Sequence, residues 1–234
     1  MSKVAFVTGA NRGIGLAIAE RLQEEGYAVA AAYRSSPPDN PDLFPVKCDV
    51  TSQTQIDQAF DEIERDLGMV EVLIANAGIT KDNLLPRMSE DDFTDVLNSN
   101  LTSGYRLTKR AIKPMMKQRK GRIIFISSVV GTTGQAGQAN YAASKAGLVG
   151  LARSIAKEFA TRNITANVIA PGPVKTNMID ELTDQQRENI LAAVPLGRFA
   201  EPEEIAATVA FLASDQAGFI TGAIIPVDGG IGMN

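Results

Sequence analysis

TGANRGIG, residues 8–15, is a glycine-rich stretch that follows the apolar run Val4–Thr8 and leads into a helical pattern beginning at Gly13. Glycine allows a tight turn and a close approach of the backbone to an anion, and the first turn of a helix offers free N–H groups to that anion. The spacing G-x-x-x-G-x-G differs from the G-x-G-x-x-G of the standard dinucleotide fingerprint. The order of strand, glycine loop and helix still predicts a nucleotide site.

Strand-like and helical patterns alternate along the rest of the chain. Short apolar runs with the composition of buried strands occur at Val4–Thr8, Ala28–Tyr33, Val46–Cys48, Glu71–Ala75, Arg122–Ser127, Thr165–Ala170 and Ala223–Val227. Apolar residues at helical spacing mark Gly13–Glu25, Gln53–Leu67, Glu90–Met116, Asn140–Thr161 and Glu203–Ala213. This order predicts one α/β domain over residues 1–234, with a doubly wound, seven-stranded parallel sheet and helices on both faces.

Composition and charge exclude several functional classes. The 234 residues carry a net charge of −4, which is unfavourable for binding nucleic acid. No apolar run approaches the ~20 residues of a membrane span, and the first residues lack a signal-peptide pattern. We therefore expect a cytoplasmic protein with no nucleic-acid, membrane or metal site.

Two local features have structural interpretations. Cys48 is the only cysteine, and without any histidine to activate it we expect a small apolar residue rather than a nucleophile. Residues 171–195 begin and end with proline and carry polar helix formers with few apolar anchors, which predicts a mobile flap.

The residues at the end of the second predicted strand bear on the choice of cofactor. An NAD site calls for an acidic residue there, about twenty residues past the glycine loop, to bind the ribose 2′-hydroxyl. This chain has Tyr33 and Arg34 instead. A guanidinium binds a 2′-phosphate through charge-assisted hydrogen bonds, and Arg12 in the glycine loop can add to them. NADPH/NADP+ is therefore favoured over NAD, although either arginine alone is equally compatible with a solvated surface cation.

Tyr141 and Lys145 lie one helical turn apart in a chain that has no histidine for proton transfer. Tyrosine titrates near pH 10, and lowering its pKa to near 7 needs roughly 4 kcal/mol in favour of the phenolate. The ammonium of Lys145 on the same helix face can supply part of this. Such pairs also occur by chance on many helices, so the pair alone favours a structural interpretation.

Ser128 supplies a third element, thirteen residues before Tyr141 and at the end of the predicted strand Arg122–Ser127. Ligands of parallel sheets bind at the carboxyl ends of the strands, where the glycine loop also lies. A hydroxyl there can bind a substrate carbonyl, which Tyr141 can protonate while the cofactor delivers hydride. The combination predicts a site for carbonyl reduction.

These motifs together resemble the classical short-chain dehydrogenase/reductase family over the length of the chain. The resemblance rests on residues 8–15, Asn76-Ala77-Gly78, Ser128 and Tyr141-x-x-x-Lys145. Within the family, residues 98–102, 140–147, 167–172 and 220–230 are most similar to the 3-oxoacyl-[acyl-carrier-protein] reductases. The segments 48–50 and 230–233 are similar to the actinobacterial members.

The resemblance implies a Rossmann fold and an NADPH-dependent reduction of 3-oxoacyl-[acyl-carrier-protein] to the 3-hydroxyacyl form in fatty-acid synthesis. It implies catalytic roles for Asn100, Ser128, Tyr141 and Lys145, with Asn100 holding the water of a proton relay. It implies cofactor contacts from Gly9, Asn11, Arg12, Gly13, Ile14, Gly15, Arg34, Asp49, Val50, Asn76, Ala77, Gly78, Tyr141, Lys145, Pro171, Gly172, Val174 and Thr176. Pro173 departs from the family pattern, which more often has a bulky aromatic or aliphatic residue there.

Some of these positions also have a simpler interpretation. Asn100 in mid-helix suits a buried polar side chain bonded only to backbone. Asp49 can cap the helix that begins after Thr51 and Ser52. Residues 76–78 alone form a strand-end turn.

Residues 109–122 concentrate basic side chains in an acidic chain. Cations near a helix C-terminus are favoured by the helix dipole and are often only solvated. The resemblance implies instead that Arg119 and Arg162 form a basic rim for an acyl carrier protein. It also implies a homotetramer that pairs through Glu90–Met116, Asn140–Thr161 and the C-terminal strand.

Other functions stay open on the sequence alone. The chain also suits a reductase of acyl-CoA, polyketide or other carbonyl substrates. From a different class, it suits a non-catalytic NADP-sensing binding protein, although such a sensor has no need of a proton donor.

Overall fold

A computed structural model describes residues 2–176 and 183–233. These residues contain a seven-stranded parallel sheet in the order β3-β2-β1-β4-β5-β6-β7. The strands are β1 (Val4–Val7), β2 (Ala28–Tyr33), β3 (Phe44–Lys47), β4 (Val70–Ala75), β5 (Gly121–Ile126), β6 (Ile164–Pro171) and β7 (Ile224–Val227). All seven predicted strands are confirmed, and the order reverses direction between β1 and β4, as in a doubly wound Rossmann-type sheet.

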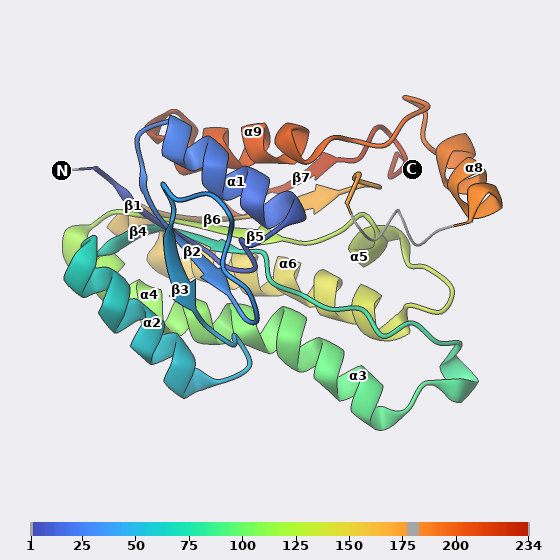
Figure 1. Cartoon of the computed structure of the whole chain (residues 1–234), viewed down its shortest axis with the longest axis horizontal. Coiled ribbons are helices and arrows are strands. Elements are labelled where there is room, and N and C mark those ends of the chain that lie inside the picture. The colour runs from blue at the N-terminus through green and yellow to red at the C-terminus, as the bar shows by residue number, and fades with distance from the viewer. Residues whose placement is uncertain (1, 177–182, 234) are drawn as a thin grey trace.

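Helices cover both faces of the sheet (Figure 1). The α-helices are α1 (Gly13–Glu24), α2 (Gln53–Asp66), α3 (Glu90–Leu97), α4 (Ser103–Gln118), α5 (Val130–Thr133), α6 (Ala139–Phe159), α8 (Asp184–Ala193) and α9 (Pro202–Ala213). Short helical turns are η1 (Leu85–Arg87), η2 (Asn98–Thr102), η3 (Ala160–Arg162) and η4 (Asp215–Ala217). α1 and α9 lie on one face, and α2, α4 and α6 lie on the other (Figure 1).

Two apolar cores explain why the strands are continuously hydrophobic. Val4 and Phe6 of β1 pack into the core beneath α2, α4 and α6, whereas Ala5 and Val7 pack into the core beneath α1 and α9. Successive side chains of a strand point to opposite faces, so a strand covered on both sides needs apolar residues at every position. The ring of Phe6 meets Phe60 of α2 edge to face, with centroids 5.2 Å apart.

The structure revises two predicted elements. The single helix expected over Glu90–Met116 is divided into α3 and α4 by a π-helical turn at Asn98–Thr102. The flap expected over 171–195 contains α8, which starts at a capping box formed by Thr183 and Gln186. Residues 177–182 of that flap lie outside the described residues, and its mobility stays a prediction.

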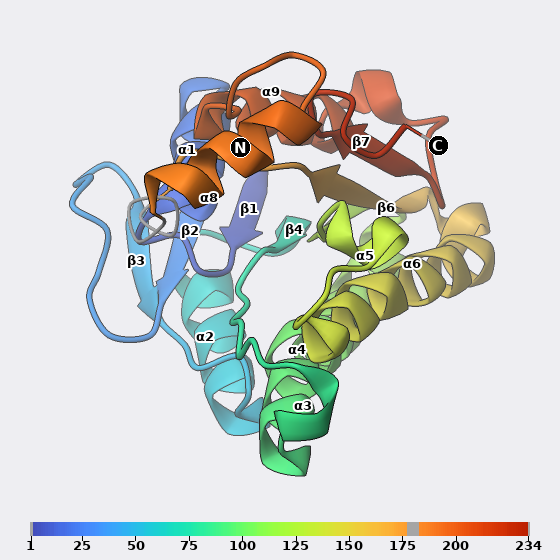
Figure 2. The same cartoon turned by 90° about the vertical axis from the view of Figure 1, so that its right-hand side faces the viewer.

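The loops that follow β1, β4, β5 and β6 leave the sheet at its carboxyl edge. Figure 2 shows the molecule from this side, with α5 and α8 in front of the sheet. The candidate site residues after these strands therefore lie on one edge of the domain.

Candidate active site

The glycine loop and the segment after β4 form a single hydrogen-bonded unit. The Asn76 side-chain amide donates to the carbonyl oxygens of Thr8 and Gly9, at 2.9 and 3.2 Å. The Thr8 hydroxyl accepts from the N–H groups of Asn76 and Ala77, at 3.0 and 3.1 Å. Asn76 thus shapes the loop with its side chain. Residues 76–78 follow β4 as irregular chain without an assigned turn, and their cofactor contact stays a prediction.

The glycines allow this close arrangement. Gly9 and Gly13 have φ of +64° and +56°, which side-chain-bearing residues rarely adopt. A Cβ on Gly15 would lie 2.1 Å from the carbonyl oxygen of Gly9, so α1 can begin this near to β1 only with glycine there. A Cβ on Gly13 would lie 3.4 Å from Cγ2 of Thr176, which places the segment after β6 against the loop.

The first turn of α1 suits a phosphate. No acidic residue lies in that turn, and Arg12 precedes the helix in an extended conformation without a side-chain cap. The first N–H groups of a helix have no partner within it and, with the helix dipole, attract an anion. The residues present therefore fit the pyrophosphate of a dinucleotide.

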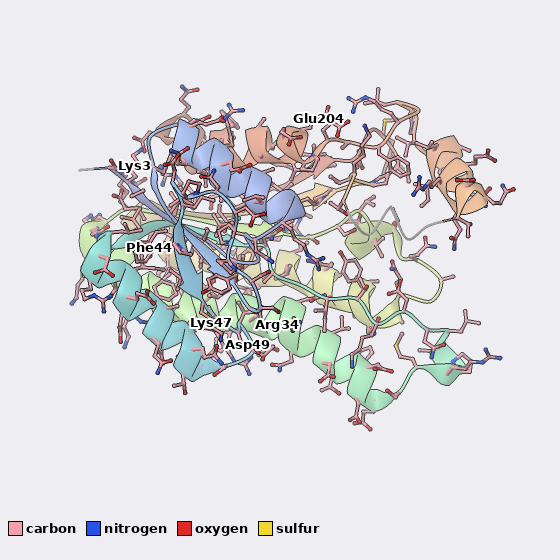
Figure 3. All side chains as sticks on the ribbon, viewed as in Figure 1. Lys3, Arg34, Phe44, Lys47, Asp49 and Glu204 are labelled. Carbon is pink, nitrogen blue, oxygen red and sulfur yellow. The ribbon has the colours of Figure 1, made fainter. Side chains whose placement is uncertain are left out.

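The carboxyl ends of β2 and β3 carry positive charge. Arg34 and Asp49 lie there together with Lys47, which pairs in register with Tyr33 (Figure 3). The side chains of Arg12, Arg34 and Lys47 are exposed and make no hydrogen bond or ion pair within residues 2–176 and 183–233. Sequence reasoning missed Lys47, for which the signal was a lysine as the last residue of a strand.

Asp49 closes the turn that leads into α2. Its carboxylate accepts from the hydroxyl and the N–H of Thr51, at 2.7 and 2.9 Å. These hydrogen bonds, with the nearby charge of Arg34, hold the pKa of Asp49 below its usual value. The helix cap itself is Ser52, whose hydroxyl accepts from the N–H of Gln55, so Asp49 does not take the capping position.

Lys145 lies at the centre of the site and is buried. Its ammonium donates to the carbonyl oxygen of Ile126 at 2.7 Å and lies 5.5 Å from the ring centroid of Tyr141. Burial lowers the pKa of Lys145 from 10.5 to about 8. A Cβ on Gly78 would lie 3.5 Å from the Lys145 ammonium and 3.0 Å from Oδ1 of Asn100, so these three residues meet.

Tyr141 is partly buried, and the Ser128 side chain lies close enough to act on its phenol. The pKa of Tyr141 is raised, because burial penalises the phenolate and the charge of Asp82 adds to the effect, while the Ser128 side chain acts in the opposite direction. The net direction is thus the opposite of the expected lowering, because burial is the largest influence on the phenol. A raised pKa keeps the phenol protonated, as a proton donor requires.

Asn100 sits in the π-helical turn and contacts both backbone and side chain. Its Oδ1 accepts from the N–H of Ile79 at 2.8 Å, and its Nδ2 donates to Ile79 O at 3.0 Å and to the Ser144 hydroxyl at 3.1 Å. The simpler interpretation, bonds to backbone only, is therefore incomplete. π-Helical turns are rare in proteins overall, and those that occur are often found at functional sites.

Sequence reasoning missed three polar residues that fix the start of α6. The Ser127 hydroxyl donates to the carbonyl oxygen of Lys145 at 2.9 Å, and the Ser144 hydroxyl donates to that of Tyr141 at 2.7 Å. Asn140 is fully buried. The sequence feature that could have identified them is a small polar residue at a position where a buried helix face or strand end usually has an apolar residue.

Residues 171–176, the described beginning of the expected flap, are held by backbone contacts. Val174 and Lys175 pair with Ala200, and a Cβ on Gly172 would lie 2.7 Å from Cα of Asp228. Pro173 lines a cleft of about 450 Å³ with Leu196 and Met233 among its other walls. Pro173, the residue that differs from the family pattern, therefore lies in the wall of this cleft.

Arg119 and Arg162 lie at the opposite edge of the sheet. The Arg119 guanidinium donates to the carbonyl oxygen of Thr161 at 3.0 Å, which brings the two arginines together. They lie where β5 and β6 begin, whereas Tyr141 lies where α6 starts. From residue 141 to residue 162 the chain advances 21 positions, which is about 30 Å of helix.

Cys48 is buried, and burial together with the charge of Asp49 raises its pKa to about 12. Its place in the core confirms the interpretation as a small apolar residue, and the raised pKa disfavours the reactive thiolate. Within the described residues, no helix is long and apolar enough to cross a membrane.

Comparisons with known proteins cover the whole chain. A family model described as enoyl-(acyl carrier protein) reductase matches residues 9–232. A 3-oxoacyl-[acyl-carrier-protein] reductase from Mycobacterium avium is 51% identical over 234 residues, covering 100% of this chain and 91% of that protein. Reductases of the same name from Salmonella typhimurium and Vibrio cholerae are 49% and 48% identical over 238 residues, covering 99% of this chain and 98% of each.

Proposed function

Because the chain belongs to the short-chain dehydrogenase/reductase family, we propose that it is an NADPH-dependent 3-oxoacyl-[acyl-carrier-protein] reductase of fatty-acid synthesis. The observation that carries the proposal is the meeting of Ser128, Tyr141 and Lys145 beside the glycine loop, in a protein about half identical to reductases of that name. A cytoplasmic location is part of the proposal.

The residues divide the reaction between them. When bound, NADPH supplies a hydride to the carbonyl carbon at position 3 of the acyl chain. The Ser128 hydroxyl holds the carbonyl oxygen, and Tyr141 gives its phenolic proton to that oxygen, so a ketone becomes a secondary alcohol. Lys145 stabilises the resulting phenolate, and Asn100 lies next to Lys145 on the route by which a proton returns.

A preference for NADPH over NADH follows from the charges at the carboxyl ends of β2 and β3. Arg34 and Lys47 supply exposed positive charge there, and Arg12 adds a third cation from the glycine loop. An acidic residue in place of Arg34 would repel a ribose 2′-phosphate, whereas these cations attract it.

Carbonyl reduction is favoured over reduction of a carbon–carbon double bond. The description of the family model names an enoyl reductase, whereas the relatives at about 50% identity are named as 3-oxoacyl reductases. Ser128 lies close enough to Tyr141 to act on its phenol, so one substrate oxygen can accept from both O–H groups. In a 3-oxoacyl thioester this oxygen is attached to the carbon that receives the hydride, whereas in an enoyl thioester the only carbonyl oxygen is that of the thioester.

The proposed carrier-protein rim, Arg119 and Arg162, lies too far from Tyr141 of the same chain to serve it directly. We propose that in a homotetramer the rim of one copy serves the site of another. The edge strand β7, with Ile224, Ile225 and Val227 partly exposed, and the exposed faces of α4 and α6 are the proposed contacts between copies.

The deciding assay follows NADPH oxidation with acetoacetyl-[acyl carrier protein], beside acetoacetyl-coenzyme A, crotonyl-[acyl carrier protein] and NADH as the control donor. Fast turnover of the 3-oxo carrier substrate with NADPH supports the proposal. Turnover of the crotonyl substrate alone would replace it by enoyl reduction, and turnover of the coenzyme A thioester alone would assign another carbonyl substrate. NADPH binding without turnover of any substrate would favour the alternative function, a non-catalytic NADP-sensing protein.

A further inference from the structure

We infer that Asn140 is a positioning residue that aims Tyr141 by fastening the first turn of α6 to the loop after β4 and to α3. The inference rests on the proposed function only in taking Tyr141 as the proton donor. Asn140 does not touch the reacting atoms, and its effect passes through the backbone of the neighbouring tyrosine.

The Asn140 side chain uses both ends of its amide. It is 0% exposed. Its Nδ2 donates to the carbonyl oxygens of Lys81 and Asp92, at 2.9 and 3.3 Å, and its Oδ1 accepts from the N–H of Tyr141 at 2.7 Å. A buried amide with partners on three segments of chain fixes their relative positions, because leaving any of these groups unpaired costs about 1–3 kcal/mol.

The start of α6 has no ordinary cap, which gives these bonds their importance. The first N–H groups of a helix need partners from outside the helix ladder. Gln138 occupies the cap position but makes no side-chain cap, and its amide donates to Asp82 at 2.7 Å instead. The N–H of Tyr141 is therefore satisfied by Asn140, and the N–H of Asn83 donates to Gly137 O at 2.9 Å.

The loop that receives these bonds is itself anchored. The Lys81 ammonium pairs with Asp92 and Asp95 of α3, at 3.0 and 2.8 Å. Asn140 therefore joins the catalytic helix to a loop and a helix that are already tied to each other. Displacement of any one of the three would move the phenol of Tyr141 relative to Ser128.

The charges around Tyr141 give this geometry a measurable consequence. The Lys145 ammonium lies 5.5 Å from the ring centroid, and Ser128 after β5 and the charge of Asp82 in the loop also act on the phenol. A shift of the first turn changes all three distances at once, so the titration of the phenol reports the position of the ring.

The test compares Asn140→Asp with Asn167→Asp. The change at Asn140 keeps the side-chain shape but replaces two donors by a carboxylate oxygen that faces two carbonyl oxygens. Asn167 is the matched control: it is 1% exposed in β6, its amide donates to Ile220 O at 2.9 Å, and its Oδ1 accepts from the N–H of Ala223 at 3.1 Å. Asn140→Ser, a smaller change, is measured as well in case the carboxylate prevents folding.

For each variant, kcat, KM for NADPH, the thermal midpoint and the ultraviolet titration of Tyr141 are measured, the last assigned by subtracting the same variant carrying Tyr141→Phe. We expect Asn140→Asp and Asn140→Ser to lower kcat on the order of 100-fold, as for a misplacement of about 1 Å, with KM for NADPH unchanged and the Tyr141 titration shifted. Asn167→Asp should lower the thermal midpoint and leave the other three unchanged.

Two results would overturn the inference. In the first, the Asn140 variants lose stability as Asn167→Asp does but keep the kcat and the Tyr141 titration of the unmodified protein. In the second, their kcat falls while the Tyr141 titration stays that of the unmodified protein. If the unmodified protein reduces no 3-oxoacyl thioester, the proposed function fails, and the Tyr141 titration still decides whether Asn140 positions the phenol.

Discussion

The ammonium of Lys145 and the carbonyl oxygen of Ile126 are joined by a buried hydrogen bond of 2.7 Å. This bond fixes a cation below the end of β5, next to Tyr141 and Gly78. The Lys145 ammonium has three N–H donors but makes only one hydrogen bond to the described residues. Burial favours the neutral amine over this ammonium. Lys145 is therefore held in place at some expense of stability.

Replacing Lys145 by methionine should change how stability depends on pH. Burial lowers the pKa of Lys145 from 10.5 to about 8, so between these values the unfolded chain binds a proton that the folded chain does not. The unmodified protein should gain stability relative to Lys145→Met as pH rises from 8 to 10.5, by about 3 kcal/mol, and gain nothing below 8. Urea unfolding at several pH values measures this. Lys157→Met, at an exposed position of the same helix, is the control and should show no such change.

Replacing Tyr141 by phenylalanine should remove nearly all turnover while NADPH binding is retained. The change deletes the proton donor, whose contribution is typically 10²- to 10⁴-fold, and keeps the ring. Tyr105→Phe removes a hydroxyl from a tyrosine that is 50% exposed on α4 and should leave activity unchanged. Steady-state rates and NADPH titration check both variants, and residual turnover near the parental rate in Tyr141→Phe would rule out the mechanism.

Gly15→Ala should abolish NADPH binding and lower the thermal midpoint. Its Cβ would lie 2.1 Å from Gly9 O and 2.5 Å from the Asn76 amide nitrogen, so the glycine loop must open. Gly150→Ala is the matched change, since a Cβ there meets nothing within 4 Å and the site is inside α6. That control should keep its NADPH affinity and gain roughly 0.5–1 kcal/mol of helix stability.

Arg34→Glu should weaken NADPH binding about 10- to 100-fold, the equivalent of losing charge-assisted hydrogen bonds to a phosphate. Binding of NADH, which has no 2′-phosphate, should change little. Arg65→Glu makes the same charge change at the exposed end of α2 and should affect neither cofactor. Equal losses for NADPH and NADH in Arg34→Glu would mean that the arginine does not recognise the 2′-phosphate.

The double variant Arg119→Glu, Arg162→Glu should lose activity on the carrier-linked substrate at low salt and keep its activity on the coenzyme A thioester. Charge complementarity mainly raises the association rate and is screened by salt, so the difference should shrink as salt is added. Arg21→Glu with Arg65→Glu places the same charges on other surfaces as the control.

Mixing subunits tests whether the rim serves another copy. The rim variant has an intact Tyr141, and Tyr141→Phe has an intact rim. Mixed assemblies refolded together should recover carrier-linked activity that neither parent has, because the rim lies about 30 Å along α6 from its own site. Absence of recovery in assemblies shown to be mixed would exclude service between copies.

The strands and the glycine loop followed from the sequence, because both depend on local chemistry. Val4–Val7 and Gly121–Ile126 are apolar at every position, as burial on both faces requires. Gly9 and Gly13 adopt positive φ values, which residues with a side chain rarely adopt. The neighbours at the site also followed, since the carboxyl ends of parallel strands share one edge.

Other features depend on packing between distant segments and were decided only by the tertiary structure. The π-helical turn that orients Asn100 toward Ile79 arises where α3 meets the loop after β4. The raised pKa of Tyr141 comes from the atoms that bury its ring, and the approach of Arg119 to Thr161 joins the ends of two helices at the edge far from the site. The sequence by itself thus determined which residues form the sheet and the glycine loop, and it predicted the catalytic group. The burial and orientation of the site side chains, and the distances between them, were set by contacts between residues tens of positions apart in the sequence. No local sequence pattern encodes such contacts.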